Sequence, residues 1–223
     1  MVSPVPANRR ERYRAEIRDE VKRLALGQLA ESGPCGLSLN TIARQMGVTG
    51  PALYRYFAGR DELLVELVVD AYEDLADMVH AAAHPTGARP PQDRVRAVAA
   101  AYREWALSQP HRYRLLFGAT VPTDRVPADR IAPAAGRTRA ALLDALSALV
   151  PSSGPAGNSA DGPANGPAVR LSRLATAAWT RWHGVLSLQI GGQFDSVGID
   201  PAVLFWAEVD ALLAAAVPGT DRG

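Results

Sequence analysis

The sequence contains very little cysteine, since Cys35 is the only one among its 223 residues. A single thiol cannot form an internal disulfide or a multi-cysteine metal site, and this scarcity is typical of a reducing compartment. Long apolar segments are also missing, because no run approaches the roughly 18 to 20 uncharged residues that span a bilayer. The N-terminal segment MVSPVPANRRERYR lacks the apolar core of a signal peptide. We therefore expect a cytoplasmic protein that has no membrane partner.

The sequence also lacks an alternating strand pattern and a recognisable catalytic group. No nucleophile, base and orienting residue can be grouped, so we expect neither an enzyme nor a cofactor. His80 and His84 lie four residues apart and would share a helix face, which is compatible with a metal ligand pair. No acidic or third histidine partner can be assigned to them, so we predict a surface pair and no metal site.

The positive charge is concentrated near the N-terminus, although the net charge of the whole chain is only +1. Residues 1 to 60 contain ten Lys or Arg against five Asp or Glu, hence +5, and the remaining residues carry −4. A basic N-terminal region is what phosphate binding by a DNA-binding domain requires.

The most specific pattern is SLNTIARQMGVTGPALYRYF, from Ser38 to Phe57. Its first half carries one apolar stripe at helical spacing, formed by Leu39, Ile42, Ala43 and Met46. Ser38 would cap this helix and Gly47 would end it. A second apolar face continues from Val48 through Leu53 to Phe57 and leaves small and polar residues on the opposite side. The pattern predicts a helix-turn-helix.

This segment resembles the DNA-binding domain of the TetR family of bacterial transcriptional repressors. The matching pieces are the helix entry SLNTIA, the turn MGVTGPALY, the end YRYF and the following GRDELL, which starts a long helix. A weaker similarity extends toward the C-terminus, where TRWHGVL (Thr180 to Leu186) resembles the Trp-His-Gly signature of a subset of TetR-like C-terminal domains. The resemblance implies a repressor that binds a pseudo-palindromic operator in double-stranded DNA and is released by a small-molecule effector.

We expect an all-α fold of about nine helices, because apolar residues recur at helical spacing along the chain. Residues 1–10 are interpreted as a flexible basic arm, residues 11–60 as a three-helix helix-turn-helix domain, and residues 61–217 as a ligand-binding and dimerisation bundle. The first helix is expected from Tyr13 to Glu31. A long helix, starting at Gly59 or Asp61 and reaching His84, would join the two domains. Residues 151–167 are rich in Pro, Gly and Ser and are predicted to be disordered.

Several residues are expected to contact DNA. The start of the second helix would reach base edges in the major groove through Thr49, Gly50, Pro51 and Ala52, with Tyr54 following. Arg44 would either recognise guanine O6 and N7 bidentately or make only a phosphate contact. The resemblance implies phosphate contacts from Ser38, Thr41, Tyr54, Tyr56 and Arg60. Arg9, Arg10, Arg12 and Arg14 would either enter the minor groove or form a solvated tail.

The central helices carry a set of large side chains that would either line an apolar cavity or simply form the core. Its members are Met78, Tyr102, Trp105, Tyr113, Phe117, Trp179, Trp182 and His183. The effector inferred from such a cavity is small and either apolar or aromatic. The two C-terminal helices, with apolar and small residues, are expected to form a homodimer interface of four helices. An architectural DNA-binding protein without an effector is the alternative interpretation, and an enzyme is the weaker one.

Overall fold

The computed structural model describes residues 9–118, 127–150 and 166–216. Within these ranges there are nine α-helices, one short 3-10 helix and no strand, which confirms the predicted all-α class. Among the described helices, none combines the length and the apolar character that crossing a bilayer requires. Most of the predicted arm and most of the predicted loop at residues 151–167 lie outside the described residues.

The first helix is longer than the sequence predicted. Helix α1 (Arg9–Ser32) begins at Arg9 rather than at Tyr13, so Arg9 and Arg10 lie on a helix and not in an arm. Both side chains are exposed, as are Arg12 and Arg14. The pattern failed to predict this first turn for a physical reason: the turn buries no side chain, so no apolar periodicity marks it.

The described residues divide into two compact units. The N-terminal unit takes its residues from Met1–Ala71 and His111–Ile131, and the C-terminal unit takes its residues from Tyr72–Pro110 and Ala132–Gly223. Helix α4 (Arg60–Ala83) therefore contributes residues to both units. The predicted domain boundary between residues 60 and 61 stays a prediction.

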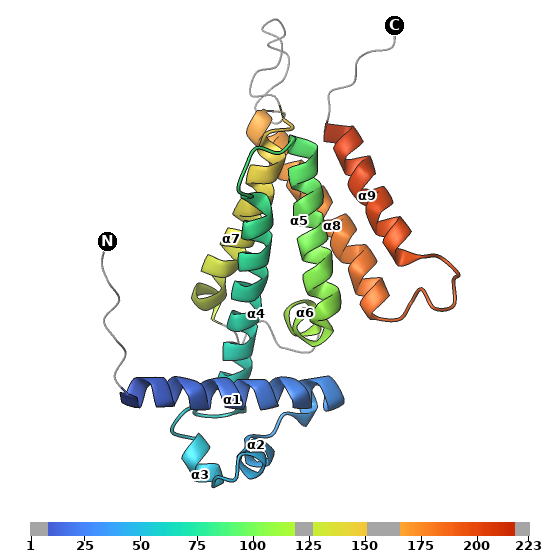
Figure 1. Cartoon of the computed structure of the whole chain (residues 1–223). Helices are drawn as coiled ribbons and strands as arrows, with labels where there is room; N and C mark the ends of the chain where they lie inside the picture. Colours follow the sequence, from blue (N-terminus) through green and yellow to red (C-terminus); the bar gives the residue numbers. More distant parts are fainter. Residues whose placement is uncertain (1–8, 119–126, 151–165, 217–223) are drawn as a thin grey trace, which may run out of the picture. The chain divides into compact units, whose positions relative to one another are not determined.

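The N-terminal unit contains α1, the 3-10 helix η1 (Pro34–Gly36), α2 (Leu39–Gln45) and α3 (Gly50–Leu53), together with most of α6 (Pro110–Phe117). Helix α1 contacts η1 and α2, and α2 contacts α3 (Figure 1). The buried apolar side chains of the segment up to residue 57 are Val21, Ala25, Leu29, Leu37, Leu39, Ile42, Ala43, Leu53 and Phe57. Met46, which the sequence placed on the apolar stripe of α2, is only half-buried.

The C-terminal unit is built from the second part of α4, α5 (Pro91–Ser108), most of α7 (Ala128–Ser147), α8 (Pro167–Ile190) and α9 (Pro201–Ala216). Helices α8 and α9 lie side by side, and both contact α5 (Figure 1). The largest fully buried side chains here are aromatic: Trp105 on α5, Trp182 on α8 and Phe205 on α9.

Candidate functional site

The first helix of the helix-turn-helix is fixed at Ser38. The Ser38 hydroxyl accepts a hydrogen bond from the Thr41 N–H at 3.3 Å, which confirms Ser38 as the N-cap of α2. The Ser38 N–H in turn donates to the side-chain oxygen of Gln28 on α1 at 2.9 Å. Gln28 is buried, so this hydrogen bond links the start of α2 to α1 away from water.

The turn between the two helices depends on Gly47, whose φ of 68° lies in the left-handed region that favours glycine. Helix α3 then spans only Gly50–Leu53 and ends before the predicted end at Phe57. Beyond it the chain tightens, because the Tyr56 N–H donates to the Leu53 carbonyl at 2.9 Å. The apolar side chains of Leu53 and Phe57 are nevertheless both buried, as the pattern predicted.

Two arginines of α1 contact the end of the helix-turn-helix. Arg18 donates to the Tyr56 carbonyl at 2.6 Å, and its guanidinium carbon lies 4.4 Å from the centre of the Phe57 ring. Arg14 donates to the Arg55 carbonyl at 3.4 Å and lies 6.0 Å from the centre of the Tyr56 ring. Sequence reasoning missed both contacts. The signal in the sequence was the spacing of Arg14 and Arg18, which lie four residues apart and therefore share one face of α1.

The outward side of α2 and α3 carries small and polar side chains. Thr49, Pro51 and Tyr54 are exposed, and 51% of the Tyr54 surface remains accessible. Arg44 is also exposed and donates to the Thr41 hydroxyl at 3.1 Å. The other predicted DNA-contacting residues are half-buried: Ser38, Thr41, Gly50, Ala52, Tyr56 and Arg60. These exposed residues present hydroxyl, guanidinium and phenol groups. Val48, in the turn between α2 and α3, is also 39% exposed, although the pattern placed it on the buried apolar face.

A carboxylate on α4 links this region to α1. Glu66 lies 2.9 Å from Arg18, 3.2 Å from Lys22 and 2.7 Å from Arg130, which stands in the first turn of α7. Burial alone would raise the pKa of Glu66, but hydrogen bonds and charge from the three cations outweigh burial and lower the pKa to about 2. Lys22 also lies 2.8 Å from Asp70. Glu66 therefore stays ionised and connects three helices within the N-terminal unit.

In the C-terminal unit, three of the predicted ligand-binding residues form one aromatic group. Tyr102 of α5 and Trp179 of α8 have ring centres 5.4 Å apart. Trp179 and His183 stack with their rings 5.9 Å apart and almost parallel, at 3°. Trp179 and His183 are half-buried, and burial lowers the pKa of His183 below its ordinary value, which favours the neutral imidazole.

The other predicted ligand-binding residues are distributed differently. Trp105 is fully buried and donates to Asp74 at 2.9 Å, and Trp182 is buried 6.3 Å from Phe205, so both fill the core. Met78 on α4 is half-buried in the same unit. Tyr113 and Phe117 contact each other edge to face at 5.0 Å on α6, in the N-terminal unit.

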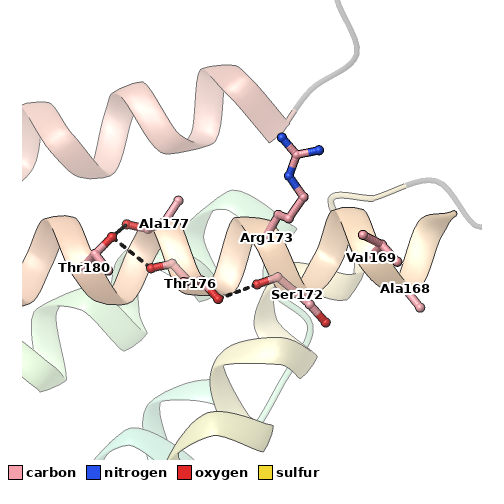
Figure 2. A pocket seen from close by; sticks show the side chains of 7 residues that line it. All are labelled: Ala168, Val169, Ser172, Arg173, Thr176, Ala177 and Thr180. Carbon is pink, nitrogen blue, oxygen red and sulfur yellow. Dashed lines mark hydrogen bonds between the residues drawn. The ribbon is translucent and has the colours of Figure 1, made fainter. Parts of the chain in front are cut away.

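A shallow groove of about 580 Å³ lies on α8 (Figure 2). It is lined by residues of α8: Ala168, Val169, Ser172, Arg173, Thr176, Ala177 and Thr180. None of these seven is a predicted ligand-binding residue. The hydroxyls of Thr176 and Thr180 already donate to backbone carbonyls of the preceding turn at 2.9 and 3.0 Å. Apart from Arg173, the groove is thus a helix surface of small side chains, two of whose hydroxyls already donate to the backbone.

The histidine pair is close, with the ring centres of His80 and His84 4.2 Å apart. Asp144 supplies an acidic neighbour that the sequence could not assign, 3.3 Å from His84, but Arg94 also binds this carboxylate at 2.6 Å. In the part of the chain that the structure describes, no three His, Cys, Asp or Glu side chains are grouped to hold a metal.

The chain is similar to known proteins along most of its length. Residues 23–67 match the family described as bacterial regulatory proteins, tetR family, and residues 95–212 match the family described as tetracyclin repressor-like, C-terminal domain. The HTH-type transcriptional regulator Rv1816 of Mycobacterium tuberculosis is 37% identical over 216 residues, which cover 90% of this chain and 92% of that protein.

Solved structures agree with this similarity. The crystal structure of the regulatory protein SCO4313 is 42% identical, with a TM-score of 0.76 over 93% of this chain and 100% of that one. A variant of TetR from Acinetobacter baumannii, solved in complex with minocycline, is 22% identical, with a TM-score of 0.55 over 87% of this chain and 93% of that one. The similarity to the TetR variant, at 22% identity, concerns the fold alone.

Proposed function

Because the chain belongs to the TetR family of transcriptional regulators, we propose that it is a dimeric repressor that binds a pseudo-palindromic operator and leaves it when a small apolar or aromatic effector binds. Its relatives are transcriptional regulators and not enzymes. The observation that carries the proposal is the helix-turn-helix itself, in which buried Leu39, Ile42 and Leu53 support an outward side of small and polar residues.

The proposed DNA contacts follow from exposure and chemistry. Thr49 can exchange a hydrogen bond with a base edge, and Pro51 can contact a thymine methyl group in the major groove. Arg44 is exposed next to Thr41 and carries the fork that fits guanine. Tyr54, Tyr56 and Arg60 carry donors suited to phosphate oxygens, which fix the position of the domain on the duplex without reading its sequence.

A dimer would supply the second helix-turn-helix that a pseudo-palindromic operator needs. Family members act as dimers. Helix α9 exposes an apolar stripe at helical spacing that suits a partner helix: Val203, Trp206, Ala207, Ala211 and Ala214. Val203 keeps 68% of its surface accessible, so this apolar side chain faces solvent in the single chain. We propose that α8 and α9 of two chains form the interface.

The effector site proposed here is the group formed by Tyr102, Trp179 and His183. A buried phenol ring, a half-buried indole and an imidazole whose burial favours its neutral form would suit an apolar or aromatic molecule that can also accept or donate one hydrogen bond. Such a molecule would release DNA only if it binds the DNA-free conformation more tightly than the bound one.

The test begins with selection of bound duplexes from a random DNA pool, followed by a screen of small molecules that release the selected duplex. We expect a two-fold symmetric site and a sedimentation coefficient that corresponds to a dimer. Uniform affinity for all duplexes would instead favour an architectural DNA-binding protein. A monodisperse monomer at micromolar concentration would contradict the proposed interface.

Two variants separate base reading from phosphate binding. Arg44→Ala should lower affinity for the selected operator by about 1–3 kcal/mol and leave binding to random duplex unchanged. Arg60→Ala should weaken both by a similar factor and reduce the dependence of affinity on salt concentration. If each variant lost the same affinity for the selected operator as for random duplex, Arg44 would not be a base-reading residue distinct from Arg60.

A further inference from the structure

Asn40 on α2 lies directly against Gly50, the first residue of α3. Its side-chain amide oxygen is 2.8 Å from the position that a Cβ atom would take on Gly50. Real Cβ atoms essentially never come this close to an oxygen, so the amide occupies space that only a glycine leaves open. The amide of Asn40 therefore stands where the side chain of residue 50 would stand in any other sequence.

The surroundings leave this amide available to a partner. Asn40 is exposed and lies four residues before Arg44, so the two share the outward face of α2. Within the described ranges, the Asn40 side chain takes part in no hydrogen bond or ion pair. Its neighbours Leu39 and Ile42 are buried, which fixes the orientation of α2 and with it the position of the amide.

We propose that Asn40 is a base-reading residue that acts in place of the side chain missing from Gly50. An asparagine amide matches adenine, because it can donate to N7 and accept from the N6 amino group at the same time. The geometry thus assigns to each half-site one adenine that α2, rather than α3, selects. This inference rests on the proposed DNA binding and adds a residue and a base to it.

Gly50 contributes by being small. Its backbone does not adopt a positive φ, so an alanine there can keep the same conformation. The new methyl group would collide with the far end of a flexible side chain, which can move at little cost to folding. Gly50→Ala should therefore displace the Asn40 amide without removing it, whereas Asn40→Ala removes it.

The experiment applies selection from a random DNA pool to the full-length protein and to Asn40→Ala, Gly50→Ala and Gln45→Ala. Gln45 is an exposed amide at the other end of α2 and serves as the matched control. Affinity is then measured on the selected duplex, on the duplex with the preferred adenine changed, and on random duplex. Thermal unfolding followed by circular dichroism checks that each variant is folded.

We expect the wild type to prefer adenine at one position of each half-site by roughly 10-fold. Asn40→Ala and Gly50→Ala should lose this preference while their affinity for random duplex and its salt dependence stay unchanged, because a neutral amide releases no counterion. Gln45→Ala should behave as the wild type.

The contrary outcomes differ from one another. A wild type that binds every duplex equally would refute the proposed operator recognition and this inference with it. A sequence-specific wild type whose preference survives in Asn40→Ala would overturn the inference alone. Loss of the preference in Asn40→Ala but not in Gly50→Ala would overturn the role given to Gly50.

Discussion

In the helix-turn-helix, short helices are linked to α1 by hydrogen bonds between side chains and the backbone, whereas in the C-terminal unit α5, α8 and α9 meet through aromatic rings. Gln28 and Arg18 make the first kind of contact, with the backbone at Ser38 and Tyr56. Trp182 packing near Phe205 illustrates the second kind. Helices as short as α2 and α3 bury too little apolar surface to be stable alone, so polar contacts complete their positioning.

This difference shows how the outward side of α2 and α3 can consist of small residues while both helices are still held in a fixed position. The polar links are made on the side of the helix-turn-helix that faces α1, so no bulky side chain is needed on its outward side. The stability of the C-terminal unit, by contrast, depends on how completely its buried side chains fill the core. We therefore expect the two regions to respond differently to substitution, with the largest losses in the aromatic core.

The largest effect is expected for Trp105→Ala. Trp105 is fully buried and its indole N–H donates to Asp74, so truncation leaves a cavity and removes one hydrogen bond to Asp74. We expect a loss of about 3–5 kcal/mol in the free energy of unfolding, measured by urea titration. Trp105→Phe, which keeps most of the volume, should lose clearly less. A loss below about 1 kcal/mol for the alanine variant would contradict volume-dependent stability in this unit.

A smaller loss is expected for Gln28→Ala in the N-terminal unit. The substitution removes the acceptor of the Ser38 N–H at a buried position, which should cost about 1–3 kcal/mol in urea unfolding. Operator affinity should fall as well, because α2 loses its link to α1. Gln45→Ala, which removes an exposed amide on α2, is the control and should change neither quantity. If both glutamine variants behave alike, the polar link does not position α2.

Glu66→Gln should cost a similar amount or less, about 1–3 kcal/mol at neutral pH, because it removes a largely buried carboxylate from cations that are themselves partly accessible to solvent. The pKa of folded Glu66 is lowered to about 2 from its ordinary value of 4.5, so the contribution is complete above pH 4.5 and is lost as the pH falls toward 2. The measurement is the difference in unfolding free energy between wild type and variant across this range. Glu73→Gln, at an exposed carboxylate of the same helix, is the matched control variant.

The smallest effect concerns His183. Burial lowers its pKa in the folded protein below the ordinary 6.5, so the unfolded chain takes up a proton first as the pH falls. Its contribution to stability is therefore complete above pH 6.5 and decreases below that value. His183→Gln should flatten the decline in unfolding free energy between pH 7.5 and about 5.5. An unchanged slope would show that the imidazole does not titrate differently in the two states.

Much of the helix-turn-helix could be predicted because its contacts are local. Leu39, Ile42 and Ala43 follow one helical repeat, Ser38 supplies a cap, and Gly47 supplies the turn, all within ten residues of sequence. The contacts between Gln28 and Ser38, between Arg18 and Tyr56, and between Asn40 and Gly50 join residues from different segments. No periodicity marks such pairs, so the sequence could not predict them.

For the aromatic residues, the sequence pattern does not tell whether a side chain lies in the core or beside a ligand. A tryptophan in the core and a tryptophan beside a ligand have the same helical spacing, and only burial separates Trp105 and Trp182 from the half-buried Trp179. The same holds for Tyr113 and Phe117, which lie in the N-terminal unit although the sequence grouped them with residues of the other unit. Which of these side chains contacts an effector stays a prediction.

The division of the chain into units has a consequence for how such a protein can evolve. The polypeptide passes from one unit to the other after Ala71, after Pro110 and after Ile131. A recombination event that exchanged only the first 71 residues with a relative would leave behind α6 and Arg130, which binds Glu66. A new operator specificity is therefore more readily acquired by point substitution on α2 and α3 than by exchange of one continuous gene segment.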